Sequence, residues 1–269
     1  MTVLLIPYYL LSVVIAAVLC ACSGLAGWAL AGLFVLCVIG AFVELMLLSI
    51  LLLAVLSMFI DPAKPQTERS PFFCGLVTYG MGVILALSSI RLHVTGTEKL
   101  PAGRFLLVQN HRSNYDPIVT GWALRKSQLV FVSKPQNLLL PVAGRILHKA
   151  GHLAIDREND RAALRTILAA ADLLRRDVTS IGVYPEGTRN PTAELLPLRT
   201  GAFKIAQKAG VPIVVSVIRG TDEVHKRAPW RATDVYLDIL TVMDAETVKR
   251  KKTSEIGDEV RAWITSADC

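Results

Sequence analysis

The first sixty residues of this chain are almost free of charge, which limits the folds open to it. Residues 1–60 contain one charged side chain, Glu44, whereas the rest of the chain carries 29 Lys and Arg residues against 21 Asp and Glu residues. About 20 apolar residues suffice to cross the hydrocarbon core of a bilayer, so a block of this length can cross it twice. The block is far longer than the apolar region of a signal peptide, roughly 7–15 residues, and no Lys or Arg precedes it. It therefore predicts an N-terminal transmembrane helical region.

Two helices are expected within this block. The first is predicted at residues 3–20 and is followed by a turn at residues 23–27. As one straight helix, the stretch from there to Ile60 would be roughly 50 Å long, longer than the hydrocarbon core, so it either tilts or breaks near Gly40 and Glu44. An acidic residue within an apolar stretch calls for an explanation. We interpret Glu44 as a boundary residue at a membrane interface or a helix junction.

A second uncharged run, residues 71–90, lies between Arg69 and Arg91 and contains three glycines. It predicts an interfacial or re-entrant helix rather than a further span. The basic residues after the apolar block place the polar part on the cytoplasmic side of the membrane. The expected organisation has three parts: a transmembrane anchor of two spans at residues 1–60, a basic linker with an interfacial helix at residues 61–90, and a single polar domain at residues 91–269.

The polar part has a net charge of +8 over residues 61–269, which suits anionic lipid headgroups and phosphorylated substrates. Nucleic acid is the other common partner of a basic domain, but the chain has no zinc-ligand spacing and no helix-turn-helix or RNA-binding signature. The five cysteines form no readable disulfide framework or metal site. We therefore expect an integral protein of the cytoplasmic membrane, with its polar domain facing the cytoplasm and with no metal and no nucleic-acid partner.

Beyond Arg91, short apolar runs alternate with helical segments, which is typical of an α/β domain with a largely parallel sheet. The expected strands are residues 104–109, 129–133, 152–155, 181–184, 211–218 and 234–240. The expected helices are residues 117–126, 138–149, 158–176, 199–210 and 245–264. In open α/β sheets ligands bind at the carboxyl ends of the strands, and the polar loops of this chain fall there.

His111 and Asp116 lie five residues apart, directly after the first expected strand. On a helix, five residues turn through about 500°, which would leave the two side chains roughly 140° apart, so they can meet only across a turn. A helix that opens at Asp116-Pro117 supplies that turn. Histidine titrates near neutral pH, and a carboxylate beside it is the usual way to deprotonate a hydroxyl. The alternative from these residues alone makes Asp116 a helix cap and His111 an ordinary loop residue.

Further charged candidates follow two later strands. Arg157 comes after the run 154–156, and the segment Glu-Gly-Thr-Arg occupies residues 186–189 after another strand. Gly187 allows close approach of the backbone, and the planar guanidinium of Arg189 suits a phosphate. The plain alternative for this segment is a polar turn with a local ion pair.

These segments belong to a set of blocks that occur in a fixed order: Asn110-His-Arg-Ser-Asn-Tyr-Asp116, Lys134 in Val-Ser-Lys, Gly151-His-Leu-Ala-Ile-Asp-Arg157, Tyr184-Pro-Glu-Gly-Thr-Arg189 and Gly201-Ala-Phe-Lys204. This order closely resembles the bacterial 1-acylglycerol-3-phosphate acyltransferases of the glycerolipid acyltransferase superfamily. The resemblance covers about half of the chain and overturns the plain alternatives for the single motifs. It implies a mixed α/β sheet flanked by helices and preceded by the membrane helices.

By this resemblance, His111 is the general base for the free hydroxyl of a 1-acylglycerol-3-phosphate, and Asp116 orients its ring. The hydroxyl attacks the thioester of acyl-CoA or acyl-carrier protein without forming an acyl-enzyme. The product is phosphatidic acid for phospholipid synthesis, and no cofactor is needed. The implied partners are lysophospholipid and acyl-thioester substrates, the bilayer, and acyl-carrier protein where that is the donor.

The resemblance also assigns residues to the acceptor's phosphate. Gly187, Thr188 and Arg189 match the block that binds it, and Glu186 sets that loop and contributes to the site. Arg157 and Lys134 are further phosphate-binding candidates. His152, a lone histidine after a glycine, is expected to be structural.

The chain departs from the commonest family pattern at Tyr184, where phenylalanine is usual, and at Ala154, where an aromatic residue is usual. Both changes bear on acceptor preference more than on chemistry. Two alternatives stay open: acylation of another lyso-lipid, such as a lyso-ornithine lipid, and a non-catalytic lipid-binding membrane protein of the same fold. The presence of His111, Asp116 and Arg189 favours an enzyme.

Overall fold

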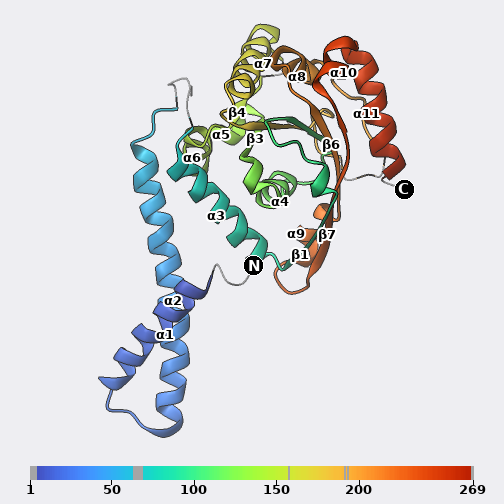
Figure 1. Cartoon of the computed structure of the whole chain (residues 1–269). Coiled ribbons are helices and arrows are strands. Elements are labelled where there is room, and N and C mark those ends of the chain that lie inside the picture. Colours follow the sequence, from blue (N-terminus) through green and yellow to red (C-terminus); the bar gives the residue numbers. More distant parts are fainter. Residues whose placement is uncertain (1–4, 63–68, 157, 191, 193, 268–269) are drawn as a thin grey trace.

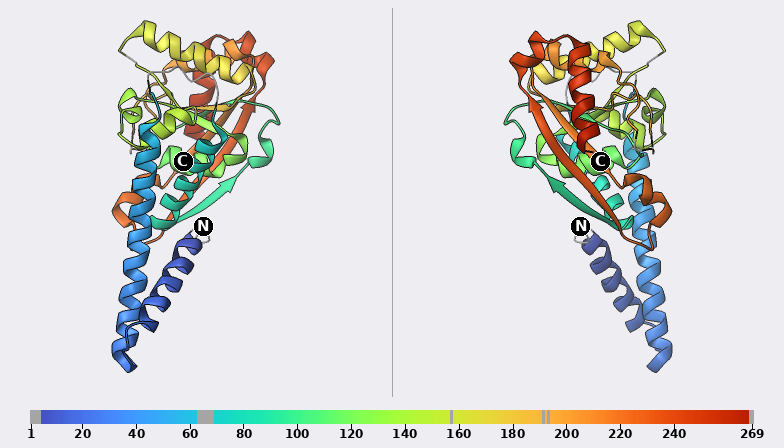
Figure 2. Two further views of the ribbon diagram at one scale, coloured as in Figure 1. Left: turned by 90° about the vertical axis from the view of Figure 1, so that its left-hand side faces the viewer. Right: turned by 90° about the vertical axis from the view of Figure 1, so that its right-hand side faces the viewer.

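The computed structural model describes residues 5–62, 69–156, 158–190, 192 and 194–267. An α/β domain carries a helical hairpin that projects from one end of it (Figures 1 and 2). The hairpin consists of α1 (Ile6–Ala21) and α2 (Gly27–Met58). The hydroxyls of Tyr8 and Ser49 are 2.8 Å apart, and the rings of Tyr8 and Phe42 meet edge to face. These contacts hold the two helices together, and the turn expected between them is present.

Helix α2 is long and apolar enough to cross a membrane, as judged by length and composition alone. Its 32 residues run unbroken through Gly40 and Glu44 and correspond to about 48 Å. Of the two alternatives, a tilt or a break, the break is therefore absent, because neither residue interrupts the helical hydrogen bonds. Helix α1 has 16 residues, about 24 Å, which is shorter than a hydrocarbon core of about 30 Å. The assignment of two spans thus stays a prediction.

Seven strands form one mixed sheet in the order β1-β7-β6-β2-β5-β3-β4. Neighbouring strands run parallel, except that β6 and β7 are antiparallel. The strands are β1 (Ile90–Thr95), β2 (Leu106–Gln109), β3 (Leu129–Ser133), β4 (Leu153–Ala154), β5 (Ser180–Val183), β6 (Ile213–Arg219) and β7 (Thr233–Met243). The prediction of an α/β domain with a largely parallel sheet flanked by helices is confirmed.

Helices cover both faces of this sheet. On one face lie α7 (Asp160–Arg175), α8 (Lys204–Ala209), α10 (Ala245–Arg250) and α11 (Thr253–Ala267); on the other lie α3 (Pro71–Leu87), α4 (Asp116–Ala123) and α9 (Val224–Arg227). Side chains alternate along a strand. Leu106 and Val108 of β2 therefore point to the core beneath α7, α8, α10 and α11, and Leu107 points to the core on the opposite face of the sheet. All four residues of β2 are buried, which places the loop after it on a rigid base.

The structure differs from the expected elements in two respects. Strand β1, which pairs with β7 at one edge of the sheet, is not among the expected strands, and its first residue lies at the end of the run expected as an interfacial helix. Three expected helices are divided. The predicted helix 138–149 splits into α5 (Pro135–Leu138) and α6 (Ala143–Lys149), because Pro141 between them cannot continue a helix. Residues 199–210 begin as a 3-10 turn before α8, and residues 245–264 divide into α10 and α11.

Helix α3 is packed into the α/β domain. Its residues Met81 and Leu85 are buried, and the helix contacts α4 and α6. Met81 lies so close to Gly121 of α4 that a Cβ atom there would meet its side chain at 2.8 Å. The domain boundary predicted at residue 91 therefore divides a packed unit, although the division into three parts stays a prediction.

This packing predicts different stabilities for two truncated chains. A chain that begins at Ser70 keeps α3, whereas one that begins at Arg91 removes Met81 and Leu85 from the core. Loss of one buried side chain of this size costs about 2–5 kcal/mol. The shorter chain should therefore unfold at a markedly lower urea concentration, as followed by circular dichroism. Both chains lack the hairpin, so equal midpoints would show that α3 adds nothing to the folded unit.

Candidate active site

The turn expected between His111 and Asp116 brings the two side chains together. His111 lies in the loop after β2, and Asp116 is the first residue of α4. His111 Nδ1 and Asp116 Oδ2 are 2.7 Å apart, and Asp116 is fully buried. Asp116 Oδ2 also accepts the backbone N–H groups of Arg112 and Ser113, and Oδ1 accepts the hydroxyl of Thr221. The carboxylate therefore receives donors from upstream of the helix and from a distant turn, and does not serve as the cap of α4.

The imidazole of His111 is fixed by a stack of aromatic rings. It lies parallel to the ring of Tyr184, with 4.1 Å between the centroids, and Tyr184 in turn stacks on Phe131 at 5.5 Å. Burial, followed by the nearby Asp116 charge, raises the pKa of the Tyr184 hydroxyl, so that it is neutral. Since Asp116 occupies Nδ1 of His111, we assign the proton to Nδ1 and the free lone pair to Nε2. This arrangement leaves Nε2 as the atom that can accept a proton.

Glu186 ties the loop after β5 to the backbone of His111. One of its carboxylate oxygens accepts the N–H of His111 at 2.8 Å, and the other accepts the N–H of Leu196 at 3.1 Å. The backbone N–H of Asn190 donates to the carbonyl of His111 at 2.6 Å. Glu186 is 6% exposed, and within the described part of the chain its carboxylate accepts hydrogen bonds from backbone donors and forms no ion pair. The two loops therefore hold each other in place.

The other candidates from the sequence that the structure describes lie at the same edge of the sheet. Gly187 has a φ of +78°, which favours glycine, and Thr188 and Arg189 are exposed beside it. Lys134 is exposed directly after β3, which neighbours β5 in the sheet. Neither the Arg189 nor the Lys134 side chain is bonded to another residue in the part of the chain that the structure describes. Arg157 lies outside the described residues.

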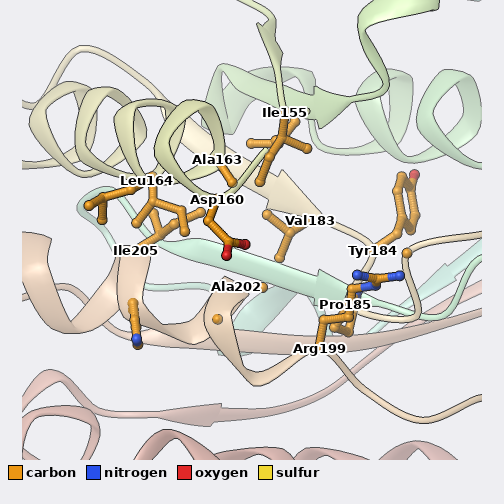
Figure 3. Close-up of a pocket in the computed structure, with 15 residues that line it drawn as sticks. Ile155, Asp160, Ala163, Leu164, Val183, Tyr184, Pro185, Arg199, Ala202 and Ile205 are labelled. Atoms are coloured by element: carbon orange, nitrogen blue, oxygen red, sulfur yellow. The ribbon is translucent and has the colours of Figure 1, made fainter. Parts of the chain in front are cut away.

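Two basic residues near this edge were not among the expected site residues. Arg199 donates its backbone N–H to the carbonyl of Pro185 at 2.8 Å and, together with Lys204, lines a cavity of about 330 Å³ (Figure 3). The rest of the lining is mainly apolar and includes Leu164, Ile167, Val183 and Ile205. Lys204 belongs to the block Gly201-Ala-Phe-Lys204, so the sequence carried a signal for it; nothing marked Arg199. Among the described residues, no three His, Cys, Asp or Glu side chains are placed to hold a metal ion.

His152 lies away from the dyad, in the interior. The N–H of Phe131 donates to its Nδ1 at 3.3 Å, and the residue is 7% exposed. Burial, with a further contribution from the nearby Arg69 charge, lowers the pKa of His152 to about 4. The folded protein therefore keeps this imidazole neutral at physiological pH.

Several known proteins are similar to this chain. A family model described as Acyltransferase matches residues 91–219. The 1-acyl-sn-glycerol-3-phosphate acyltransferase of Haemophilus influenzae is 30% identical over 177 residues, which are 65% of this chain and 73% of that protein. The enzyme of the same name from Escherichia coli is 31% identical over 160 residues, which are 60% of this chain and 65% of that protein. The chain thus spans about two thirds to three quarters of the length of these relatives.

A solved structure shares the fold. The crystal structure of the 1-acyl-sn-glycerophosphate (LPA) acyltransferase, PlsC, from Thermotoga maritima superposes with a TM-score of 0.57 at 22% identity. The superposition covers 81% of this chain and 94% of that one. At this identity the likeness is one of fold, and it confirms the mixed sheet flanked by helices that the sequence resemblance implies.

The lowered pKa of His152 predicts an acid-dependent loss of stability. An unfolded histidine takes up a proton near pH 6.5, whereas the folded one does so only near pH 4. Below pH 6.5 protons therefore favour the unfolded chain, and the free energy of unfolding should fall by on the order of 3 kcal/mol between pH 6.5 and 4. His152→Asn keeps an acceptor for the Phe131 N–H and should lack this contribution. Denaturant unfolding at several pH values measures the difference, with the exposed His225→Asn as control. Parallel pH profiles for the wild type and His152→Asn would contradict it.

Proposed function

This chain belongs to the 1-acyl-sn-glycerol-3-phosphate acyltransferase family, and we propose that it moves a fatty acyl chain from a thioester to the free hydroxyl of 1-acylglycerol-3-phosphate. The observation that carries the proposal is the 2.7 Å contact between His111 Nδ1 and the buried carboxylate of Asp116. It leaves Nε2 as a base, and it fixes the ring that carries the base. The acyl donor is acyl-CoA or acyl-carrier protein, and the product is phosphatidic acid for phospholipid synthesis.

The reaction follows from the two side chains. Nε2 of His111 takes the proton of the acceptor hydroxyl while the hydroxyl oxygen attacks the thioester carbonyl carbon. Asp116 holds the imidazole and stabilises its cationic form, as the aspartate does in a Ser-His-Asp triad. The tetrahedral intermediate then expels the thiolate, which receives the proton from His111. The substrate's hydroxyl takes the place of a serine, so no acyl-enzyme and no cofactor is needed.

The loop that Glu186 holds in place through its hydrogen bonds is proposed to bind the acceptor's phosphate. The guanidinium of Arg189 is exposed at this loop and presents the paired donors that a phosphate accepts. Gly187 and Thr188 belong to the same turn, and Lys134 and Arg157 are further candidates for this phosphate. The apolar cavity lined by Leu164 and Ile167 lies beneath the loop and suits a fatty acyl chain.

The membrane is proposed as the place of the reaction. The apolar hairpin anchors the chain, and the basic domain faces the cytoplasmic surface, where a lysophospholipid and its product both reside. Acylation of a different lyso-lipid, such as a lyso-ornithine lipid, is the second candidate, because Tyr184 and Ala154 depart from the usual family residues. A non-catalytic lipid-binding role is disfavoured by the intact dyad geometry.

Replacement of the base should abolish acyl transfer. General-base catalysis typically contributes about 10²–10⁴-fold to a rate, so His111→Ala should lower kcat by that factor with purified protein and a labelled acyl thioester. Asp116→Asn keeps an acceptor for the ring but loses the negative charge, and it should cost less if orientation of the ring is the main role of Asp116. The exposed His225→Ala serves as the control and should leave kcat unchanged. Near-normal turnover by His111→Ala would contradict the proposed mechanism.

A second prediction separates phosphate binding from donor binding. Arg189→Lys keeps the positive charge but removes the planar fork of donors. The KM for the phosphorylated acceptor should therefore rise by a much larger factor than the KM for the acyl donor. Arg231→Lys, at an exposed position in the turn before β7, is the matched control. Equal effects on the two Michaelis constants would place Arg189 outside the phosphate site.

The membrane assignment predicts how the full chain resists extraction. Residues 1–60 hold one charge, so neither high salt nor alkaline carbonate should release the protein from membranes, and detergent should. Fractionation followed by immunoblotting measures this. Release of the intact protein by salt alone would mean that the apolar block is an interfacial anchor and spans nothing.

A further inference from the structure

A second cavity lies at the edge of the sheet opposite to His111. Its volume is about 520 Å³, and it is lined by the start of α3 and by the turns that precede β3 and β5. Since these strands are parallel to β2, and His111 follows the carboxyl end of β2, the cavity lies at the amino ends of the strands. The four residues of β2 alone span about 13 Å. The cavity is therefore separate from the proposed active site.

The cavity contains a partly buried guanidinium that has no carboxylate partner among the described residues. Arg69 donates from Nη1 to Oε1 of Gln128 at 2.8 Å, but its Nε is buried and has no hydrogen-bond partner among the described residues. No acidic side chain in the described part of the chain forms an ion pair with Arg69. Burial lowers the pKa of Arg69; the Cys74 side chain, which contacts it, raises the pKa and only partly offsets this, and the charge of Arg104 adds a smaller lowering. Charges removed from water are normally paired, because an unpaired one is destabilising, so this guanidinium indicates an anion.

Two more arginines lie near Arg69, and one of them, Arg125, donates from Nη1 to the carbonyl of Trp122 at 2.9 Å. Arg104 donates from Nη2 to the same oxygen of Gln128 at 3.0 Å, and Arg125 lines the cavity directly. Arg104 Nε lies 3.1 Å from Oδ1 of Asp177. Among the described residues, this is one carboxylate for three guanidinium groups. Helix α3 begins beside Arg69 and adds the positive end of its dipole. Guanidinium forks next to a helix N-terminus match a phosphate group.

The surroundings of the cavity suit a lipid. Helix α6 contacts both the end of α2 and the start of α3: Arg145 donates to the carbonyl of Ser57, and the N–H of Ser70 donates to the carbonyl of Lys149 (Figure 1). Large apolar side chains on these segments are exposed, among them Phe59 at 85%, Phe72 at 62% and Leu139 at 76%. Basic groups beside exposed apolar side chains are typical of a surface that meets a bilayer interface.

We propose that the cavity formed by Arg69, Arg125 and Gln128 binds the phosphate of an anionic membrane phospholipid, at a site distinct from the one that holds the acceptor. The headgroup phosphate pairs with Arg69 and Arg125, and the acyl chains lie against the exposed apolar side chains at the ends of α2 and α3. A soluble phosphate ester offers the same chemistry to the arginines but not to the apolar side chains. A bound lipid would thereby fix the α/β domain at the point where the anchor enters it.

The test measures thermal unfolding of the detergent-solubilised full chain. The wild type is compared with Arg69→Gln, Arg125→Gln, the remote control Arg250→Gln on α10, and Arg189→Lys in the proposed acceptor site. Each protein is titrated with short-chain phosphatidylglycerol, with phosphatidylcholine of the same chain length, and with inorganic phosphate. A ligand well above its Kd should raise the Tm by about 3–6 °C.

We expect phosphatidylglycerol to raise the Tm of the wild type, of Arg250→Gln and of Arg189→Lys, and to have little effect on Arg69→Gln and Arg125→Gln. Arg125 is exposed, so its replacement tests the site even where Arg69→Gln impairs folding. If inorganic phosphate raised the Tm as much as phosphatidylglycerol does, and did so only when Arg69 is present, the cavity would bind a soluble phosphate and the assignment to a lipid would be wrong. An undiminished response to phosphatidylglycerol in the two cavity variants would overturn the proposal, as would a response lost only in Arg189→Lys.

Discussion

The buried carboxylate of Asp116 determines how the catalytic edge of this domain is built. A fully buried charge is tolerated only when hydrogen-bond donors replace its water, and Asp116 has four of them: the ring of His111, two backbone N–H groups and the hydroxyl of Thr221. These donors come from the loop after β2 and from the turn after β6. Satisfying this one group therefore fixes the loop conformation, the position of α4 and the orientation of the imidazole together.

A second buried carboxylate, that of Glu186, is also stabilised by hydrogen-bond donors. Glu186 accepts N–H groups from His111 and from Leu196, and so joins the loops that follow β2 and β5. In a substrate complex, the proposed base on one loop and the proposed phosphate-binding groups on the other would then keep a constant separation. Because the acceptor hydroxyl and its phosphate are parts of one small molecule, such a fixed separation supports positioning, which is a major source of rate acceleration.

Much of this could be predicted from the sequence, and the failures have physical causes. The spacing of His111 and Asp116 required a turn, and the strand before it and Pro117 after it placed that turn correctly. The edge strand β1 was missed because its residues follow directly on an apolar run, so the change of period is hard to see. Thr221, which completes the shell of Asp116, lies more than a hundred residues away, and only the tertiary structure brings it there. The burial of Arg69 without a carboxylate partner among the described residues is likewise visible only once α3 is packed against the α4–β3 turn.

Acceptor preference in a purified system tests the central claim most directly. The full chain, with one acyl thioester, should be assayed against lysophosphatidic acid, glycerol-3-phosphate, a zwitterionic lysophospholipid and a lyso-ornithine lipid. If His111 serves as base beside a loop that holds a phosphate monoester, kcat/KM should be highest for lysophosphatidic acid. A preference for lyso-ornithine lipid, or the absence of acyl transfer to every acceptor, would contradict this account.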